Sequence, residues 1–324
     1  MHVVIYGAGA IGGVIGAHLF ASGTPTTLVA RGTHLQAIRG KGLILDTDGG
    51  LLVQPIPSAR SAAEVDWTDD SVVLVCVKSQ QTAAALDDLR AHAPSDIPIV
   101  SAQNGVANEP ALLRVFPRVY SVCVMLPAWH VDPGVVVQGS SAAPGILDVG
   151  RFPGGVDAVA DELSERFRAA SFPSRTRPDI TAWKYRKLIT NLGNGVDACY
   201  RDDGNARAEL TRLARAEGES VLAAAGIAAV SDATDKERRG NHIQRRRSGA
   251  EGGGNSTWQS VVRGGGTSEI DYLSGEIVLL GRLHGVPTPV NALVQSETAR
   301  VVREHLSPES LDPVDALRGL DAAG

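Results

Sequence analysis

The stretch from Val3 to Phe20 reads VVIYGAGAIGGVIGAHLF, which is an apolar run, a glycine-rich turn and a helical segment. The turn has the spacing G-x-G-x-x-G and consists of Gly7, Ala8, Gly9, Ala10, Ile11 and Gly12. In this pattern the first glycine permits a tight turn, the second lets the backbone approach a pyrophosphate, and the third allows close packing of helix on strand. A plain structural turn is the alternative. The position between a strand and a helix favours a dinucleotide-binding unit.

Apolar runs and helical patterns alternate through the first half of the chain. Further strands are predicted at 26–30, 71–77 and 97–101, and the segments 119–125, 135–138 and 146–149 are expected to extend the same sheet. The unbroken apolar run at 71–77 is typical of a strand that is buried on both faces of a parallel sheet. The alternation predicts the α/β class, with an N-terminal Rossmann-type doubly wound sheet.

The pattern changes after Phe172, where Pro173 and Pro178 bracket a short polar linker. Long helical patterns at 181–200, 206–225 and 268–284 predict a C-terminal all-helical domain. Because 324 residues exceed one ordinary core, we expect a Rossmann-like cofactor domain at 1–175 and a helical substrate and catalytic domain at 176–324. The polar segment 235–256, with its arginine triplet at 245–247, is interpreted as a solvated mobile loop rather than a phosphate site.

The composition excludes several classes of protein. A net charge of −5 and an aromatic content of 4% argue against a nucleic-acid partner. The three cysteines lie far apart without a CxxC pair, so we expect no disulfide framework and no metal site, and a reducing compartment. No apolar run approaches the ~20 residues that cross a bilayer, and no basic leader precedes the first strand. We therefore expect a cytoplasmic protein with no membrane partner, and we leave open whether it forms a homodimer.

The residues after the second strand bear on the choice of cofactor. In NAD-binding domains an acidic residue at this place binds the ribose 2′-hydroxyl, whereas this chain has Ala30 and Arg31 and no acid before Asp46. A guanidinium can pair with a 2′-phosphate through charge-assisted hydrogen bonds. Arg31 therefore predicts NADP(H) as the cofactor. The alternative is an arginine that merely points into solvent.

A polar stripe marks the first helical pattern of the C-terminal half. Lys187, Asn191 and Asn194 are spaced i, i+4, i+7, which places them along one side of a helix. An amphipathic helix with a solvated polar face is the alternative, but asparagine is a weak helix former there. Amides beside one lysine suit a substrate with a carboxylate and a hydroxyl group. Lys184, one turn earlier, is expected on a neighbouring surface.

Over nearly its whole length, the chain resembles the ketopantoate reductase family, also called 2-dehydropantoate 2-reductases. The resemblance rests on the order and spacing of motifs: the glycine turn, Lys78, Gln103-Asn104-Gly105, Lys187-Leu188 with Asn191, Ser268-Glu269-Ile270-Asp271-Tyr272, and Leu283-His284-Gly285-Val286-Pro287 with Pro289 and Asn291. It implies NADPH-dependent reduction of a 2-oxo acid to the 2-hydroxy acid, and a place in pantothenate biosynthesis.

The resemblance also implies roles for individual residues. Lys187 would donate the proton, and Asn104 would lie between nicotinamide and substrate. Cofactor contacts are implied for Lys78, Asn104, Glu269 and the backbone of Ala128, and substrate contacts for Asn104, Asn191 and Ser256, to which the stripe adds Asn194.

Two departures from the family pattern affect the substrate side. The usual second asparagine of the helix would fall at position 195, which is glycine here, and Asn194 comes one residue earlier. The spacing from Gln259 to Glu269 is one residue longer, through the glycines at 264–266. Ketopantoate is therefore one candidate substrate among several. The alternatives are the same fold acting on another oxo or hydroxy acid, or a non-catalytic NADP(H)-binding redox sensor.

Overall fold

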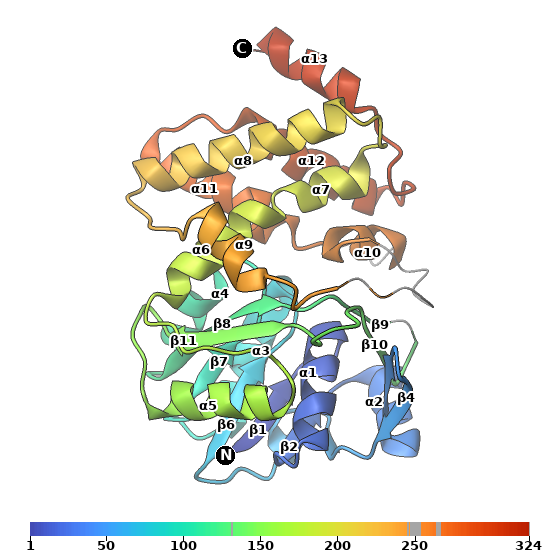
Figure 1. Ribbon diagram of the computed structural model, residues 1–324, viewed down its shortest axis with the longest axis vertical. Helices are drawn as coiled ribbons and strands as arrows, with labels where there is room; N and C mark the ends of the chain where they lie inside the picture. Colours follow the sequence, from blue (N-terminus) through green and yellow to red (C-terminus); the bar gives the residue numbers. More distant parts are fainter. Residues whose placement is uncertain (131, 245, 247–253, 264–266, 324) are drawn as a thin grey trace. The chain divides into compact units, whose positions relative to one another are not determined.

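In the computed structural model, β1 (His2–Tyr6) lies inside a mainly parallel sheet (Figure 1). All of its strands except the short one at Ser58–Ala59 lie at predicted apolar runs. Among the described residues this sheet has seven strands in the order β11-β8-β7-β6-β1-β2-β5. Their bounds are β2 (Thr26–Val29), β5 (Ser58–Ala59), β6 (Ser71–Val75), β7 (Ile99–Ser101), β8 (Val119–Met125) and β11 (Ile146–Arg151). Only the β11–β8 pair is antiparallel, because these neighbours are joined without a crossover helix.

Helices cover both faces of this sheet, as the side-chain alternation of β1 requires. Val3 and Ile5 lie in a buried cluster with residues of α1 (Ala10–Ala21) and α5 (Ala158–Ala169). Val4 and Tyr6 lie in another with α3 (Thr82–His92) and α4 (Asn108–Leu113). The predicted Rossmann-type doubly wound domain is confirmed.

A second sheet packs against α1 on the side away from β1. Its order is β4-β3-β10-β9, with bounds β3 (Leu43–Thr47), β4 (Gly50–Gln54), β9 (Ala128–His130) and β10 (Val135–Gln138). Small residues let α1 fit between the sheets: a Cβ on Gly13 would lie 2.7 Å from Val136, and one on Gly16 would lie 2.7 Å from Leu28. The expectation that 135–138 extends the main sheet is therefore wrong, because these residues pair with β3 and β9 instead.

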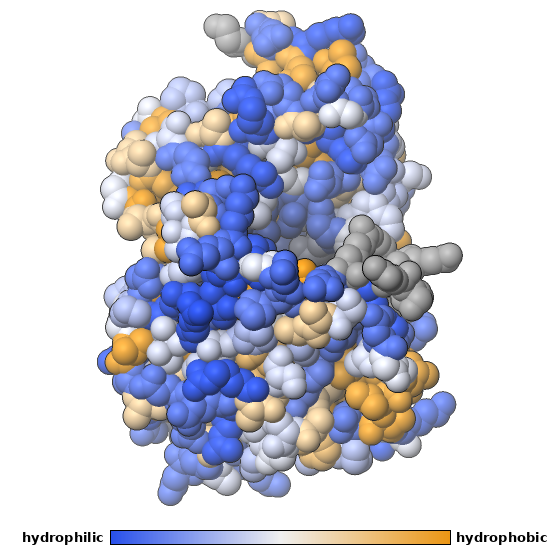
Figure 2. Space-filling model, viewed as in Figure 1, coloured by the Kyte–Doolittle hydropathy of each residue, from blue (hydrophilic) through white to orange (hydrophobic). Residues whose placement is uncertain are grey.

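The strand β4 forms an exposed edge of the second sheet. Leu51, Leu52 and Val53 are 66%, 45% and 59% exposed, and they form an apolar area on the face seen in Figure 2. Edge strands of this kind are usually shielded by charges or proline, neither of which occurs between Gly50 and Gln54.

The C-terminal helices bury their apolar sides against one another. They are α6 (Ile180–Asn191), α7 (Gly193–Cys199), α8 (Ala206–Ala224), α10 (Ser256–Arg263), the 3₁₀ helix η3 (Ile270–Tyr272), α11 (Ser274–His284), α12 (Pro289–Arg303) and α13 (Pro313–Ala323). The predicted helix 181–200 is divided at Leu192 into α6 and α7. Glu217 of α8 caps α12 by accepting hydrogen bonds from the Val290 and Asn291 amides at 2.8 and 2.9 Å. The predicted helical domain is confirmed.

The structure describes residues 1–130, 132–244, 246, 254–263 and 267–323, and the chain divides into two units. The first unit contains Met1–Lys184 with Asp232–Ala250, and the second contains Tyr185–Ser231 with Glu251–Gly324. Compared with the expected domains 1–175 and 176–324, the first unit extends into α6 and includes a later segment. No helix within the described residues is long and apolar enough to cross a membrane.

Ion pairs, one of them fully buried, hold that later segment on the rest of the first unit. Arg238, from α9 (Asp232–Arg239), donates to both carboxylate oxygens of the fully buried Asp148, at 2.6 and 2.8 Å. Arg246 donates to Asp46 and Asp48 at 2.7 and 2.6 Å. The prediction of a loop over 235–256 is therefore wrong for its first residues, which are helical because these contacts order them. Residues 245 and 247–253 lie outside the described part.

Candidate functional site

The carboxyl ends of four parallel strands bring four of the predicted segments to one edge of the sheet. In the strand register Tyr6 is level with Val29 and Val75, and Val75 is level with Ser101. The residues that follow are therefore neighbours: the glycine turn, Arg31, Lys78 and Asn104. β1 lies between β2, to which the chain leads first, and β6, which it forms later. The strand order therefore reverses beside β1, and α/β sheets bind ligands at such a point.

The glycine turn has the geometry of a pyrophosphate cradle. Gly7 has a φ of +106°, and a Cβ on Gly12 would lie 2.1 Å from the Gly7 carbonyl oxygen, so neither position accepts a side chain. A Cβ on Gly9 would meet no atom within 4 Å, which leaves open space at the start of α1. The N-cap residue of that helix is Gly9 itself, which has no side chain to cap the first amides. This combination of free space and helix amides fits a dinucleotide phosphate.

His34 of α2 (Gly32–Lys41) holds this turn in place, and sequence reasoning missed it. Its Nε2 donates to the Ala8 carbonyl at 2.7 Å, while its Nδ1 accepts from the Gly134 amide at 2.9 Å. An imidazole that accepts at Nδ1 and donates at Nε2 is neutral. Burial lowers the pKa of His34, which favours the same neutral form. No sequence motif marks this contact, because Gly134 is distant in the chain.

Arg31 lies two residues after the end of β2 and is exposed at the edge of the sheet. Its guanidinium donates to the Tyr6 hydroxyl at 3.2 Å, and that hydroxyl donates to Asp88 at 2.6 Å. Burial and the Asp88 hydrogen bond raise the pKa of Tyr6, so the phenol stays protonated. The guanidinium is thus oriented on one side and retains other donors for an anion.

The Gln103-Asn104-Gly105 turn is held by a buried hydrogen-bond network. The Gln103 amide donates to the Val77 carbonyl and the Thr82 hydroxyl, both at 2.9 Å. Asn108 accepts from Thr82 at 2.8 Å and donates to the Asn104 carbonyl at 3.3 Å. Gly105 has a φ of +74°, which ends the turn in the left-handed region that favours glycine. The half-buried side chain of Asn104 is therefore presented by a fixed backbone.

The location of the Lys184 side chain differs from the one predicted from the sequence. It was expected on a surface, but its side chain is 4% exposed and forms an ion pair with Glu109, which is 2% exposed. The ammonium also donates to the Gln103 carbonyl at 3.2 Å. The prediction was wrong because helical spacing alone cannot show that the N-terminal half of α6 packs against Glu109 of α4.

Two more predicted cofactor residues lie in the first unit. Lys78 follows β6 by three residues and is half-buried. Ala128 is the first residue of β9 in the second sheet, where it pairs with Gln138 and is 9% exposed.

In the second unit the polar stripe lies on the side of α6 and α7 opposite their apolar contacts. Leu188, Ile189 and Leu192 are at most 2% exposed, whereas Lys187, Asn191 and Asn194 are half-buried. Position 195 faces the helical core, because a Cβ on Gly195 would lie 2.7 Å from Val294. An asparagine could not fit there, so Asn194 is the residue of α7 that presents an amide near Asn191.

Asn255 is a second residue that sequence reasoning missed. Its side-chain oxygen accepts from the Thr257 and Trp258 amides at 3.0 Å, which caps α10, and its amide donates to the Asn194 carbonyl at 3.1 Å. This bridge places Ser256 next to the stripe. An asparagine immediately before Ser-Thr is a recognisable helix cap, so this signal was present in the sequence. Glu269 precedes η3 and is half-buried; the glycines at 264–266 lie outside the described residues.

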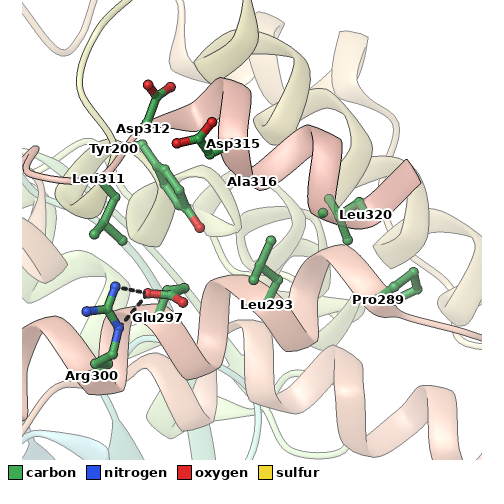
Figure 3. A pocket seen from close by; sticks show the side chains of 11 residues that line it. Tyr200, Pro289, Leu293, Glu297, Arg300, Leu311, Asp312, Asp315, Ala316 and Leu320 are labelled. Carbon is green, nitrogen blue, oxygen red and sulfur yellow. Dashed lines mark hydrogen bonds and ion pairs between the residues drawn. The ribbon is translucent and has the colours of Figure 1, made fainter. Parts of the chain in front are cut away.

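A pocket of ≈ 610 Å³ in the second unit contains none of these residues (Figure 3). It lies between α12 and α13 and is lined by apolar side chains such as Leu293 and Leu320, with the Glu297–Arg300 ion pair at its wall. The Tyr200 ring enters it, and the Tyr200 hydroxyl has no hydrogen-bond partner among the described residues.

Two family models match the chain. The model described as ketopantoate reductase PanE/ApbA matches residues 3–154, and the model of the C-terminal part of the same family matches 179–301.

Named relatives and solved structures agree with these matches. The chain is 27% identical to a 2-dehydropantoate 2-reductase of Pyrococcus horikoshii, over 91% of this chain and 95% of the relative. It is 29% identical to that of Mesorhizobium japonicum, over 94% and 98%. A ketopantoate reductase structure from Ralstonia eutropha superposes with a TM-score of 0.79 at 27% identity, covering 94% of this chain and 99% of that one. A D-mandelate dehydrogenase bound to NADH and anilino(oxo)acetate shares the fold, with a TM-score of 0.79, 22% identity and coverage of 94% and 99%.

Proposed function

Because the chain belongs to the ketopantoate reductase family, we propose that it reduces a 2-oxo acid to the 2-hydroxy acid with NADPH. The observation that carries this proposal is the row of glycine turn, Arg31, Lys78 and Asn104 at the carboxyl ends of neighbouring strands. Such a row would form a dinucleotide site, with the polar side chain of Asn104 at its nicotinamide end.

The first unit would hold the cofactor. The open space at Gly9 and the amides at the start of α1 suit the pyrophosphate, and Arg31 suits the 2′-phosphate. Asn104 would orient the nicotinamide and the substrate carbonyl, and Lys78, Ala128 and Glu269 would complete the cofactor contacts. NADPH, when bound, supplies the hydride.

The helical domain would provide the proton and the substrate contacts. Lys187 would donate a proton from its ammonium to the carbonyl oxygen, which becomes the hydroxyl oxygen of the product. The positive charge also stabilises negative charge that develops on this oxygen. Asn191, Asn194 and Ser256 offer amide and hydroxyl donors for the substrate carboxylate.

The substrate need not be ketopantoate. Position 195 has no room for the family's second asparagine. If Asn194 takes its role from one residue earlier, it would approach the substrate from a different direction. The fold also serves a D-mandelate dehydrogenase, whose ligand is an aromatic oxo acid derivative. An enzyme for another oxo or hydroxy acid is therefore the second candidate.

The test follows NADPH absorbance with a panel of aliphatic and aromatic 2-oxo acids that includes ketopantoate. We expect turnover with at least one acid, and faster turnover with NADPH than with NADH. Tight NADPH binding without turnover on any acid, in either direction, would favour a non-catalytic redox sensor and contradict the proposed reaction.

A further inference from the structure

The Lys184–Glu109 pair is the most deeply buried lysine–carboxylate contact that the described residues show, with side chains 4% and 2% exposed. Glu109 also accepts from the fully buried Ser121 hydroxyl at 3.2 Å. Removing two charges from water costs more than packing apolar side chains of similar size, so the pair is not explained by stability alone.

The same ammonium donates to the Gln103 carbonyl at 3.2 Å. That carbonyl belongs to the peptide group whose nitrogen is that of Asn104. On the other side, Asn108 donates to the Asn104 carbonyl at 3.3 Å. Both peptide groups that flank Asn104 are therefore held by buried side chains, and Lys184 supplies the charged contact, which is the stronger kind.

We propose that Lys184 is a positioning residue for Asn104: with Glu109 as its counter-ion, it fixes the peptide from which the Asn104 side chain projects. This inference rests on the proposed function for its effect on catalysis. The contacts themselves lie wholly within the first unit.

The expected consequence is a loss of rate rather than of cofactor binding. The pyrophosphate cradle follows β1, whereas the Gln103-Asn104-Gly105 turn follows β7. A displacement of about 1 Å at a group that orients the reacting atoms can lower the rate by about 10²-fold.

The first experiment measures backbone hydrogen exchange and needs no substrate. Lys184→Met alone would leave the Glu109 carboxylate buried without a cation, so it is combined with Glu109→Gln; Lys184→Gln with Glu109→Gln is the milder second variant. We expect the amides of 103–109 to exchange about 10-fold faster, with little change elsewhere in the sheet. Unchanged exchange at 103–109 would overturn the proposal.

The second experiment is a double-mutant cycle with Asn104→Ala on an active substrate. In the otherwise native enzyme the paired change should lower kcat about 10- to 100-fold without altering the Kd of NADPH. In the Asn104→Ala background it should lower kcat less than about 2-fold, because the residue that Lys184 acts through is gone. An equal loss in both backgrounds would overturn the positioning role.

The matched control is Lys236→Met, which removes an ion-paired but 75% exposed lysine and should change neither measurement. If the native protein reduces no 2-oxo acid, the proposed function fails, and hydrogen exchange still decides the role of Lys184.

Discussion

Replacing Arg31 by alanine should reduce the preference for NADPH over NADH and leave NADH binding almost unchanged. The guanidinium follows β2 and is oriented by the Tyr6 hydroxyl at 3.2 Å, so its remaining donors can meet a 2′-phosphate. A hydrogen bond to a charged group contributes about 1.5–3 kcal/mol. Because Arg31 is exposed, solvent screening favours the lower value, about 1.5 kcal/mol, which corresponds to about a 10-fold change in Kd.

The assay is a fluorescence titration of each cofactor against native protein and variant, repeated at two salt concentrations. The NADPH advantage of the native protein should shrink at higher salt, because exposed charges are screened over ~10 Å at 0.1 M. Arg39→Ala is the control: Arg39 is likewise an exposed arginine, but it lies within α2 and is ion-paired with Glu64 at 2.7 Å. Equal weakening of NADPH and NADH in Arg31→Ala would refute the reasoning.

The remaining predictions concern the proton donor, the cradle and stability. Lys187→Ala should lower kcat by about 10²- to 10⁴-fold in steady-state assays, with cofactor binding retained, because a general acid is lost; near-native turnover would exclude this role. Gly9→Val should weaken NADPH and NADH alike by more than about 10-fold in the same titrations, since its side chain would occupy the open space; an unchanged Kd would show that no phosphate lies there. It should leave the Tm unchanged, because a Cβ on Gly9 meets no atom within 4 Å. Asp148→Asn should reduce the free energy of unfolding in urea by about 3–5 kcal/mol, because Arg238 would stay buried without its carboxylate; a loss below ~1 kcal/mol would contradict this. Burial lowers the pKa of His2, His18 and His34, so the unfolded chain binds their protons more readily. Their contribution to stability should be complete above about pH 6.5 and should be lost as the pH falls from there toward their lowered pKa values in the folded state. An equal free energy of unfolding in urea at about pH 7 and pH 5 would count against this prediction.

Much of the main sheet was predictable because its signals are local. The glycine spacing at 7–12 and the apolar runs at β1, β2, β6 and β7 each depend on neighbouring residues, and the structure confirms them. The second sheet was not predicted. In β3 and β4 apolar and polar residues alternate only weakly, and β9 has only three residues. The apolar composition of β10 predicts a strand, but only its pairing with β3 shows to which sheet it belongs.

The sequence by itself determined which residue types are present at the ends of the strands, and hence the fold class and the family resemblance. Only the tertiary structure decided which of them share a contact. Lys184 and Lys187 look alike in the sequence, yet Lys184 is buried against Glu109, 75 positions away. His34 reaches Gly134, which is 100 positions away, and thereby supports the glycine turn. The physical reason is that periodicity reports which side of an element is apolar, whereas buried polar contacts depend on partners that folding brings together from distant parts of the chain.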